Sequence, residues 1–116
     1  MKPGLMPGSF VFCVVPGACI PVETIGTFRE TEGLTIILPQ QVAKANDFAY
    51  DGVWRQITLH VHSSLHAVGF LAAITTRLAA AGISVNAIAA FHHDHLFVPE
   101  GREVEAMEIL EGFGGA

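Results

Sequence analysis

Residues 55–88 read RQITLHVHSSLHAVGFLAAITTRLAAAGISVNAI, and this stretch decides the fold. At its start apolar residues alternate with polar ones, and Ile57, Leu59 and Val61 fall on one face, which indicates a strand with one buried side. A long segment rich in Ala and Leu follows and ends at Gly82, which suits the left-handed position after a helix. A further β-branched segment begins beyond Gly82. The stretch therefore predicts a strand, a helix and a second strand in succession.

The rest of the chain predicts strands and short helices on both sides of this unit. In the N-terminal half, residues 1–52, turn signals such as Pro16-Gly17 separate runs of β-branched and aromatic residues. There we expect strands over 9–15, 27–30 and 34–38 and a short helix over 39–46. In the C-terminal half, residues 53–116, we expect a strand over 54–61, a helix over 65–81, strands over 84–91 and 95–98, and a helix over 100–111.

This element order predicts an α+β fold. The C-terminal half has the order β-α-β-β-α, which is one strand short of a ferredoxin-like βαββαβ unit. We expect the N-terminal half to contribute extra strands, with Phe10 to Val15 or its neighbours filling the gap. The result would be a two-layer sandwich, with an antiparallel sheet and helices on one face.

The predicted helix over 65–81 has two apolar stripes, whereas a surface helix needs only one. The second stripe passes through Phe70 and Ile74. Because 51% of the residues are hydrophobic in a chain of only 116, we expect some apolar surface to meet another subunit. We assign the second stripe to that assembly surface and expect a homodimer.

Composition excludes several classes of function. The net charge is −5 with six Lys and Arg, which argues against nucleic-acid binding, since that requires a basic surface. The most apolar segment, residues 65–73, is too short to cross a bilayer, so no membrane association is expected. The first residues do not have the continuous apolar core of a signal peptide. We expect a cytoplasmic protein.

Several phrases of the sequence resemble the ACT-domain family. Three segments of the C-terminal half carry this resemblance: HSSLHAVG at 62–69, LAAAGISVNAI at 78–88 and HHDHLFV at 92–98. The last is similar to the hairpin of the ACT halves of cytosolic arginine-sensing proteins of animals. TFRE at 27–30 and EGLT at 32–35 resemble small bacterial tandem-ACT proteins of unassigned function. The resemblance implies a partial ACT-like half over 1–52 and an ACT-like domain over 53–116.

The resemblance also implies a function without catalysis. ACT domains commonly bind amino acids or other small effectors, usually between two ACT units, and many regulate an attached enzyme. In that family the start of the strand after the helix often contacts a ligand of the neighbouring unit, which points to Ile83, Ser84 and Asn86. Alternatively, Asn86 is an edge-strand residue that only bonds to a loop. His62 and Ser63 stand where many members have Asp before the helix.

The remaining candidate site residues follow from chemistry. Ser63 and Ser64 precede the predicted helix, whose free N–H groups and positive dipole end suit a carboxylate; alternatively, a serine there only caps the helix. Gly69 permits close approach of a ligand, or of a packed helix.

Two arginines, Arg29 and Arg55, are also candidate anion ligands. The guanidinium of Arg55, at the start of a strand, is able to grip a carboxylate at two points. The alternative is that these arginines pair with acidic side chains of the chain itself, namely Glu23, Glu30, Glu32 or Asp51.

Six histidines raise the question of a metal site. They are His60, His62, His66, His92, His93 and His95, the last two flanking Asp94. Neither group has the helical spacing or the thiolates of a standard zinc site, so we expect no metal and no cofactor. The sequence favours a regulatory protein that senses an amino acid or related small carboxylate. A ligand-free assembly module is the alternative, and a metal-dependent enzyme built on the histidines is the third hypothesis.

Overall fold

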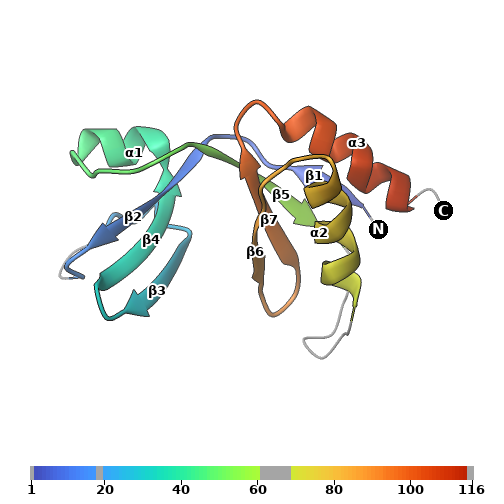
Figure 1. The fold of residues 1–116 in the computed structure, drawn as a ribbon. Helices are drawn as coiled ribbons and strands as arrows, with labels where there is room; N and C mark the ends of the chain where they lie inside the picture. The colour runs from blue at the N-terminus through green and yellow to red at the C-terminus, as the bar shows by residue number, and fades with distance from the viewer. Residues whose placement is uncertain (1, 18–19, 61–68, 115–116) are drawn as a thin grey trace. The chain divides into compact units, whose positions relative to one another are not determined.

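The computed structural model describes residues 2–17, 20–60 and 69–114 (Figure 1). The chain divides into two compact units. We call Met1–Pro7 together with Arg55–Ala116 the C-terminal unit, and Gly8–Trp54 the N-terminal unit. Among the described residues, no helix combines the length and apolarity needed to cross a membrane.

The C-terminal unit contains a ferredoxin-like sheet. Its strands are β1 (Pro3–Leu5), β5 (Trp54–Leu59), β6 (Asn86–Ala89) and β7 (Asp94–Pro99), in the order β1-β5-β7-β6. β1 runs antiparallel to β5, with Pro3 opposite Leu59 and Leu5 opposite Ile57. β6 runs antiparallel to β7, with Asn86 opposite Phe97. This order is the one that a βαββαβ unit produces when its last strand lies beside its first.

Two helices, α2 (Phe70–Ala80) and α3 (Glu103–Gly114), cover one face of this sheet. The alternation of β5 turns Ile57 and Leu59 toward them, as the sequence predicted, and both are fully buried. The core consists of residues from β5, β7, both helices and the turn after α2, namely Ile57, Leu59, Ile74, Leu78, Ile83, Leu96, Val98, Ala106 and Leu110. The predicted α+β, ferredoxin-like fold is confirmed.

The strand that completes this sheet differs from the one expected. β1 fills the gap, whereas Phe10 to Val15 belongs to the N-terminal unit. Residues 3–5 are Pro, Gly and Leu, which have no strand pattern of their own. Their pairing depends on β5, and Met6 N–H also donates to the carbonyl of Gln56 on β5 at 2.9 Å.

The second apolar stripe of α2 is also not an assembly surface. Ile74 is fully buried in the core of its own unit and Phe70 packs against that core. Ile74 and Leu78 are one turn apart and face the sheet together. The exposed side of α2 instead carries small residues, Ala72, Ala73, Thr76, Ala79 and Ala80.

Two other elements have shorter or shifted bounds for local reasons. β6 ends at Ala89, not at residue 91, because Ala90 N–H donates to the carbonyl of His93 at 3.0 Å and closes a turn. α3 begins at Glu103, not at residue 100, because Gly101 has a φ of 100°, which a helix cannot contain.

The helix expected from residue 65 begins as α2 at Phe70, because Gly69 before it has a left-handed φ of 89°. The strand expected to reach residue 61 ends as β5 at Leu59. Residues 61–68 lie outside the described residues.

The N-terminal unit is a smaller relative of the same topology. Its strands β2 (Phe10–Val15), β3 (Gly26–Glu30) and β4 (Gly33–Pro39) pair in the order β3-β4-β2, and α1 (Gln40–Ala45) follows β4. Trp54 pairs with Phe10, so the first residue of β5 takes the place of a fourth strand. The described residues that connect β2 to β3 contain no helix. In βαββαβ order, this connection stands where the first helix belongs.

Candidate functional site

The predicted ligand edge begins at the N-terminus of α2. Ser63 and Ser64 lie outside the described residues. The N-cap of α2 is Gly69, with a left-handed φ of 89° and ψ of −18°. Because glycine has no side chain, the cap residue satisfies none of the free N–H groups of the first turn. Within the described residues, the cap supplies no side-chain acceptor to this end of α2, where the helix dipole places a partial positive charge.

Ile83, Ser84 and Asn86 lie beyond the opposite end of α2. Ile83 is buried, and its N–H donates to the carbonyl of Leu78 at 3.0 Å, so it helps to terminate the helix. Ser84 and Asn86 are exposed, and Asn86 opens β6, whose four residues are all exposed. Eleven helical residues span roughly 16 Å. Gly69 and Asn86 of one copy therefore cannot contact the same small ligand.

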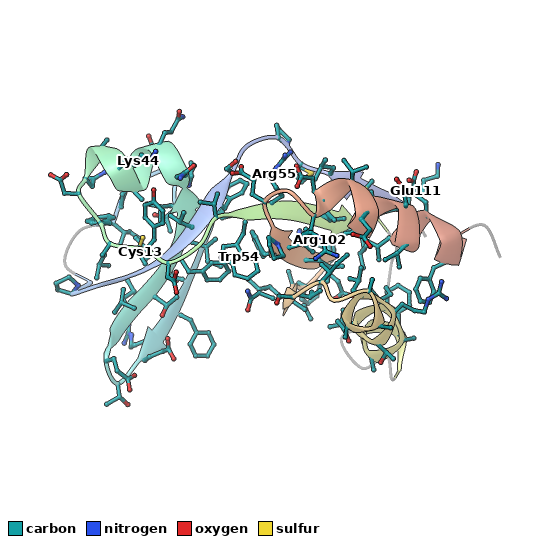
Figure 2. All side chains as sticks on the ribbon, turned by 45° about the horizontal axis from the view of Figure 1, so that its top comes forward. Cys13, Lys44, Trp54, Arg55, Arg102 and Glu111 are labelled. Carbon is teal, nitrogen blue, oxygen red and sulfur yellow. The ribbon has the colours of Figure 1, made fainter. Side chains whose placement is uncertain are left out.

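Arg55 forms an ion pair within its own unit. It lies near the start of α3 (Figure 2), and its Nη1 donates to Oε2 of Glu103 at 2.9 Å. Its Nη2 donates to the carbonyl of Met6 at 3.4 Å. The expected alternative, a pair with an acidic residue, therefore occurs, but with Glu103 and none of the four acids named from the sequence. Hydrogen bonds from the backbone N–H of Glu103 itself lower its pKa, and Gly101 N–H and Arg55 reinforce the shift.

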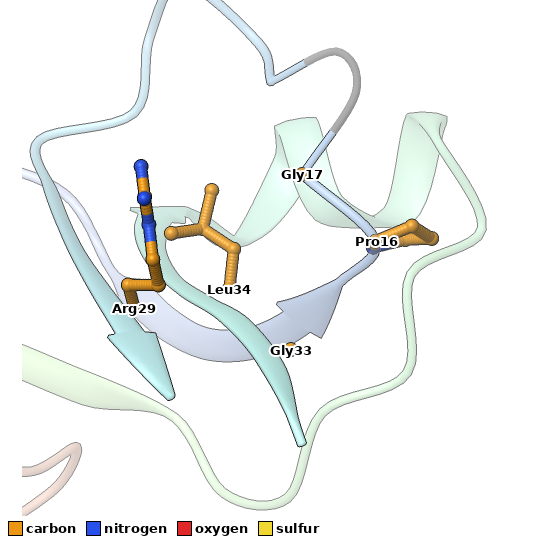
Figure 3. Close-up of a pocket in the computed structure, with 5 residues that line it drawn as sticks. All are labelled: Pro16, Gly17, Arg29, Gly33 and Leu34. Carbon is orange, nitrogen blue, oxygen red and sulfur yellow. The ribbon is translucent and has the colours of Figure 1, made fainter. Parts of the chain in front are cut away.

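A pocket of about 270 Å³ lies in the N-terminal unit (Figure 3). Its lining residues are Pro16, Gly17, Arg29, Gly33 and Leu34. Arg29 and Leu34 are opposite each other on β3 and β4, and their side chains rise side by side on one face of the sheet. Pro16 and Gly17 belong to the connection that follows β2.

The helix-free face of the C-terminal unit carries a group of polar side chains. His95 Nδ1 lies 3.0 Å from Thr58 Oγ1 and 3.3 Å from Gln56 Nε2. The rings of His60 and His93 meet edge to face, with centroids 5.6 Å apart. Burial lowers the pKa of His95, and the nearby His93 adds to the shift. Within residues 2–17, 20–60 and 69–114, no three His, Cys, Asp or Glu side chains converge as metal ligands, while His62 and His66 fall outside these ranges.

Comparison with known families assigns the chain to a class. One ACT-domain profile matches residues 1–55 and a second matches residues 51–112. The chain belongs to the ACT-domain family, and it holds two ACT-type domains in tandem. ACT domains are typically regulatory, bind small molecules and are not catalytic.

Solved structures agree with this assignment. A Vibrio cholerae protein of unknown function, described as a possible transport protein, has 46% identity and a TM-score of 0.88, over 93% of this chain and 85% of its own. A protein from Agrobacterium tumefaciens has 20% identity and a TM-score of 0.72, over 95% and 86%. Aspartokinase alpha and beta subunits give 12% identity and a TM-score of 0.73, over 100% and 99%. At these identities the last two show a shared fold alone. No curated protein shows significant sequence similarity to this chain.

The sequence offers Arg29 as a candidate anion ligand or ion-pair partner, but it does not place this side chain in a pocket. No local signal connects it to Pro16 and Gly17, which come together with it only when β2, β3 and β4 pair. The available signal is the connection after the first strand, which contains Pro16, Gly17 and Pro21, residues that disfavour a helix there.

Proposed function

We propose that this chain is a cytoplasmic, non-catalytic regulatory protein that senses an amino acid or a related small carboxylate between ACT units of two copies. Membership in the ACT-domain family supports small-molecule binding in general. The observation that carries the finer proposal is the cap of α2, where Gly69 leaves the N–H groups of the first turn without a side-chain partner from the cap. Such donors at the positive end of a helix suit a carboxylate.

The proposed site takes residues from two copies. Ser63, Ser64 and Gly69 of one copy would meet Ile83, Ser84 and Asn86 of the other, because Gly69 and Asn86 of one copy lie beyond opposite ends of α2. Ile83 is buried, so only its backbone is offered. The exposed edge strand β6 supplies the surface for the second copy, since an unpaired strand edge readily pairs with another chain. Arg55 is left out, because its guanidinium holds Glu103.

The ligand would act through linkage. A ligand shifts an equilibrium between two arrangements only by its difference in affinity for them. Binding at a dimer interface therefore stabilises the dimer and changes the surface that a regulated partner contacts.

A thermal-shift screen of the twenty amino acids and their 2-oxo acids tests the proposal. A ligand at 100 times its dissociation constant stabilises the folded state by about 2.7 kcal/mol, which moves the melting temperature by several degrees. Light scattering should then show that the ligand promotes the dimer, and Asn86→Ala should weaken this effect. If no compound raises the melting temperature at millimolar concentration, the sensor proposal is wrong.

One observation favours the alternative of a ligand-free assembly module. Val14 and Phe28 are 60% and 71% exposed, and both lie opposite Thr35 on the same face of the N-terminal sheet. Two neighbouring exposed apolar side chains suit contact with another protein. Under this alternative, Val14→Thr with Phe28→Ser abolishes self-association, whereas Asn86→Ala and every small molecule leave it unchanged.

A further inference from the structure

We propose that the N-terminal unit contains its own binding site for a small apolar carboxylate, held by Arg29 beside a connection whose described part has no helix. Only the class of the ligand, a carboxylate, rests on the sensor function proposed above. The proposal assigns that class to a different unit and to residues outside the two-copy site.

The position of the pocket follows from the topology. In the C-terminal unit, α2 connects the first two strands of the βαββαβ order and covers the sheet. In the N-terminal unit the corresponding connection has no helix in its described part. The face that it leaves open carries Val15, Leu34 and Arg29 in one row, since Leu34 lies opposite Val15 on one side and opposite Arg29 on the other. Val15 belongs to the core cluster of this unit and Leu34 packs against that cluster, so this row lies on the core-side face of the sheet.

The charge of Arg29 is not compensated by a partner within the part of the chain that the structure describes. Arg55 and Arg102 pair with Glu103 and Glu105, and Arg77 lies over the ring of Phe113. Arg29 makes no such contact, although the chain has eleven acidic residues for six basic ones. The adjacent Glu30 accepts a hydrogen bond from Thr35 Oγ1 at 2.5 Å instead.

Arg29 and Glu30 are neighbours on β3, and neighbouring residues of a strand point to opposite faces, so Glu30 does not reach the face that carries Arg29. A free guanidinium beside a pocket offers paired N–H donors whose spacing fits a carboxylate.

The walls of the pocket define the rest of the ligand. Leu34 and Pro16 supply apolar surface (Figure 3). Gly17 has a φ of 95°, and a Cβ on it would lie 3.6 Å from Leu34 Cβ, so a side chain there would narrow the space. The volume of about 270 Å³ is just below the range of drug-sized ligand sites, which suits a metabolite of a few carbons.

Among the described residues, no acidic side chain lines the pocket, so nothing in this part of the lining neutralises an ammonium group. The site should therefore recognise a carboxylate and a short apolar chain, whether or not an amine is present.

Calorimetric titration with three probes separates these features. Isovalerate has the carboxylate and the apolar chain, L-leucine adds an amine, and isovaleramide lacks the charge. We expect the wild-type protein to bind isovalerate and L-leucine with similar affinity, and isovaleramide at least about tenfold more weakly. In amide NMR spectra, isovalerate should shift the signals of Gly17 and Gly33.

Two variants with the same change of net charge locate the site. Arg29→Gln should weaken isovalerate binding about tenfold or more, whereas Lys44→Gln, on α1 of the same unit, should leave it within about twofold of wild type. Arg29 is exposed, so Arg29→Gln is expected to fold, and its melting curve checks this.

Each remaining outcome counts against a stated claim. If carboxylates bind and Arg29→Gln binds them as wild type does, the Arg29 site is wrong while the sensor function survives. If L-leucine binds at Arg29 and isovalerate does not, the amine is required and the ligand class is wrong. If wild type binds no carboxylate at millimolar concentration, both this site and the proposed function fail.

Discussion

Arg55 and Glu103 are joined by an ion pair in which Arg55 Nη1 lies 2.9 Å from Glu103 Oε2, with side chains only 20% and 16% exposed. The pair connects β5 to the first turn of α3. The other terminal nitrogen of Arg55, Nη2, donates a hydrogen bond to the carbonyl of Met6, the residue that follows β1. One guanidinium thus holds three segments of the C-terminal unit that are remote in sequence.

Replacing Arg55 with Met should lower the free energy of unfolding by about 1–2 kcal/mol, between the values of exposed and buried pairs. The loss comes from the stranded Glu103 carboxylate and the freed Met6 carbonyl. In the Glu103→Gln background the same substitution should cost less, because no uncompensated charge remains. Urea denaturation of the four proteins gives the coupling. Equal costs in both backgrounds would show that the pair contributes nothing.

His95 should make stability depend on pH near neutrality. Burial lowers its pKa below the ordinary 6.5, with His93 adding to the shift, His60 a smaller lowering and Asp94 opposing it. The unfolded chain therefore takes up a proton at a higher pH than the folded protein does. Stability due to neutral His95 is complete above pH 6.5 and is lost as pH falls from there toward the folded pKa.

His95→Gln keeps a hydrogen-bonding group beside Thr58 but cannot be protonated. Between about pH 7.5 and about pH 5.5, the variant should lose less unfolding free energy than wild type. Proton NMR of the ring gives the pKa of His95 directly. A value at or above 6.5 would contradict the burial argument.

Residues 2–7 should be required for the C-terminal unit to fold. β1 pairs with β5 and packs against α3, and both ends of the chain belong to this unit (Figure 1). A fragment of residues 53–114 leaves one side of β5 unpaired and should unfold without cooperativity or aggregate. Joining residues 2–7 after α3 through a short Gly-Ser linker should restore a cooperative transition. Circular dichroism during heating compares the fragment with and without residues 2–7. If both fragments are equally stable, β1 is dispensable for folding.

Ile74→Ala should reduce stability by about 2–5 kcal/mol, because it removes a fully buried side chain from the core. Ala73→Ser, its exposed neighbour on α2, should cost less than about 1 kcal/mol. Denaturant midpoints measure both. Similar small effects would mean that this face of α2 does not form the core of the unit. Because the Phe70–Ile74 stripe packs inside its own unit, neither substitution should change self-association.

The sequence predicts most reliably the elements whose pattern is long and regular. The alternation around Ile57 and Leu59 and the Gly82 stop identified β5 and α2. β1 escaped prediction, since three residues that include Pro and Gly carry no period. Glycine is favoured at position 4 because the side chain of His60, remote in sequence, lies against it: a Cβ on Gly4 would lie 2.7 Å from His60 Nε2.

The faces of α2 and the pocket at Arg29 illustrate a second limit. Both apolar stripes of α2 were visible, but the stripe that packs inward is set by the sheet on which the helix lies. Arg29 likewise has ordinary neighbours in sequence, and its proximity to Gly17 depends on the pairing of three strands. Of the predicted site residues, Ser63 and Ser64 lie outside the described residues, so their role stays a prediction.

The pairing of Pro3 with Leu59 has a consequence for how the protein is made. β1 leaves the ribosome before β5 and α3, and it must wait for both of them before the C-terminal unit closes. Such long-range closure slows folding and prolongs the exposure of strand edges. Nascent chains arrested before residue 59 should therefore depend on chaperones, whereas the N-terminal unit, complete at Trp54, is ready to form on the ribosome.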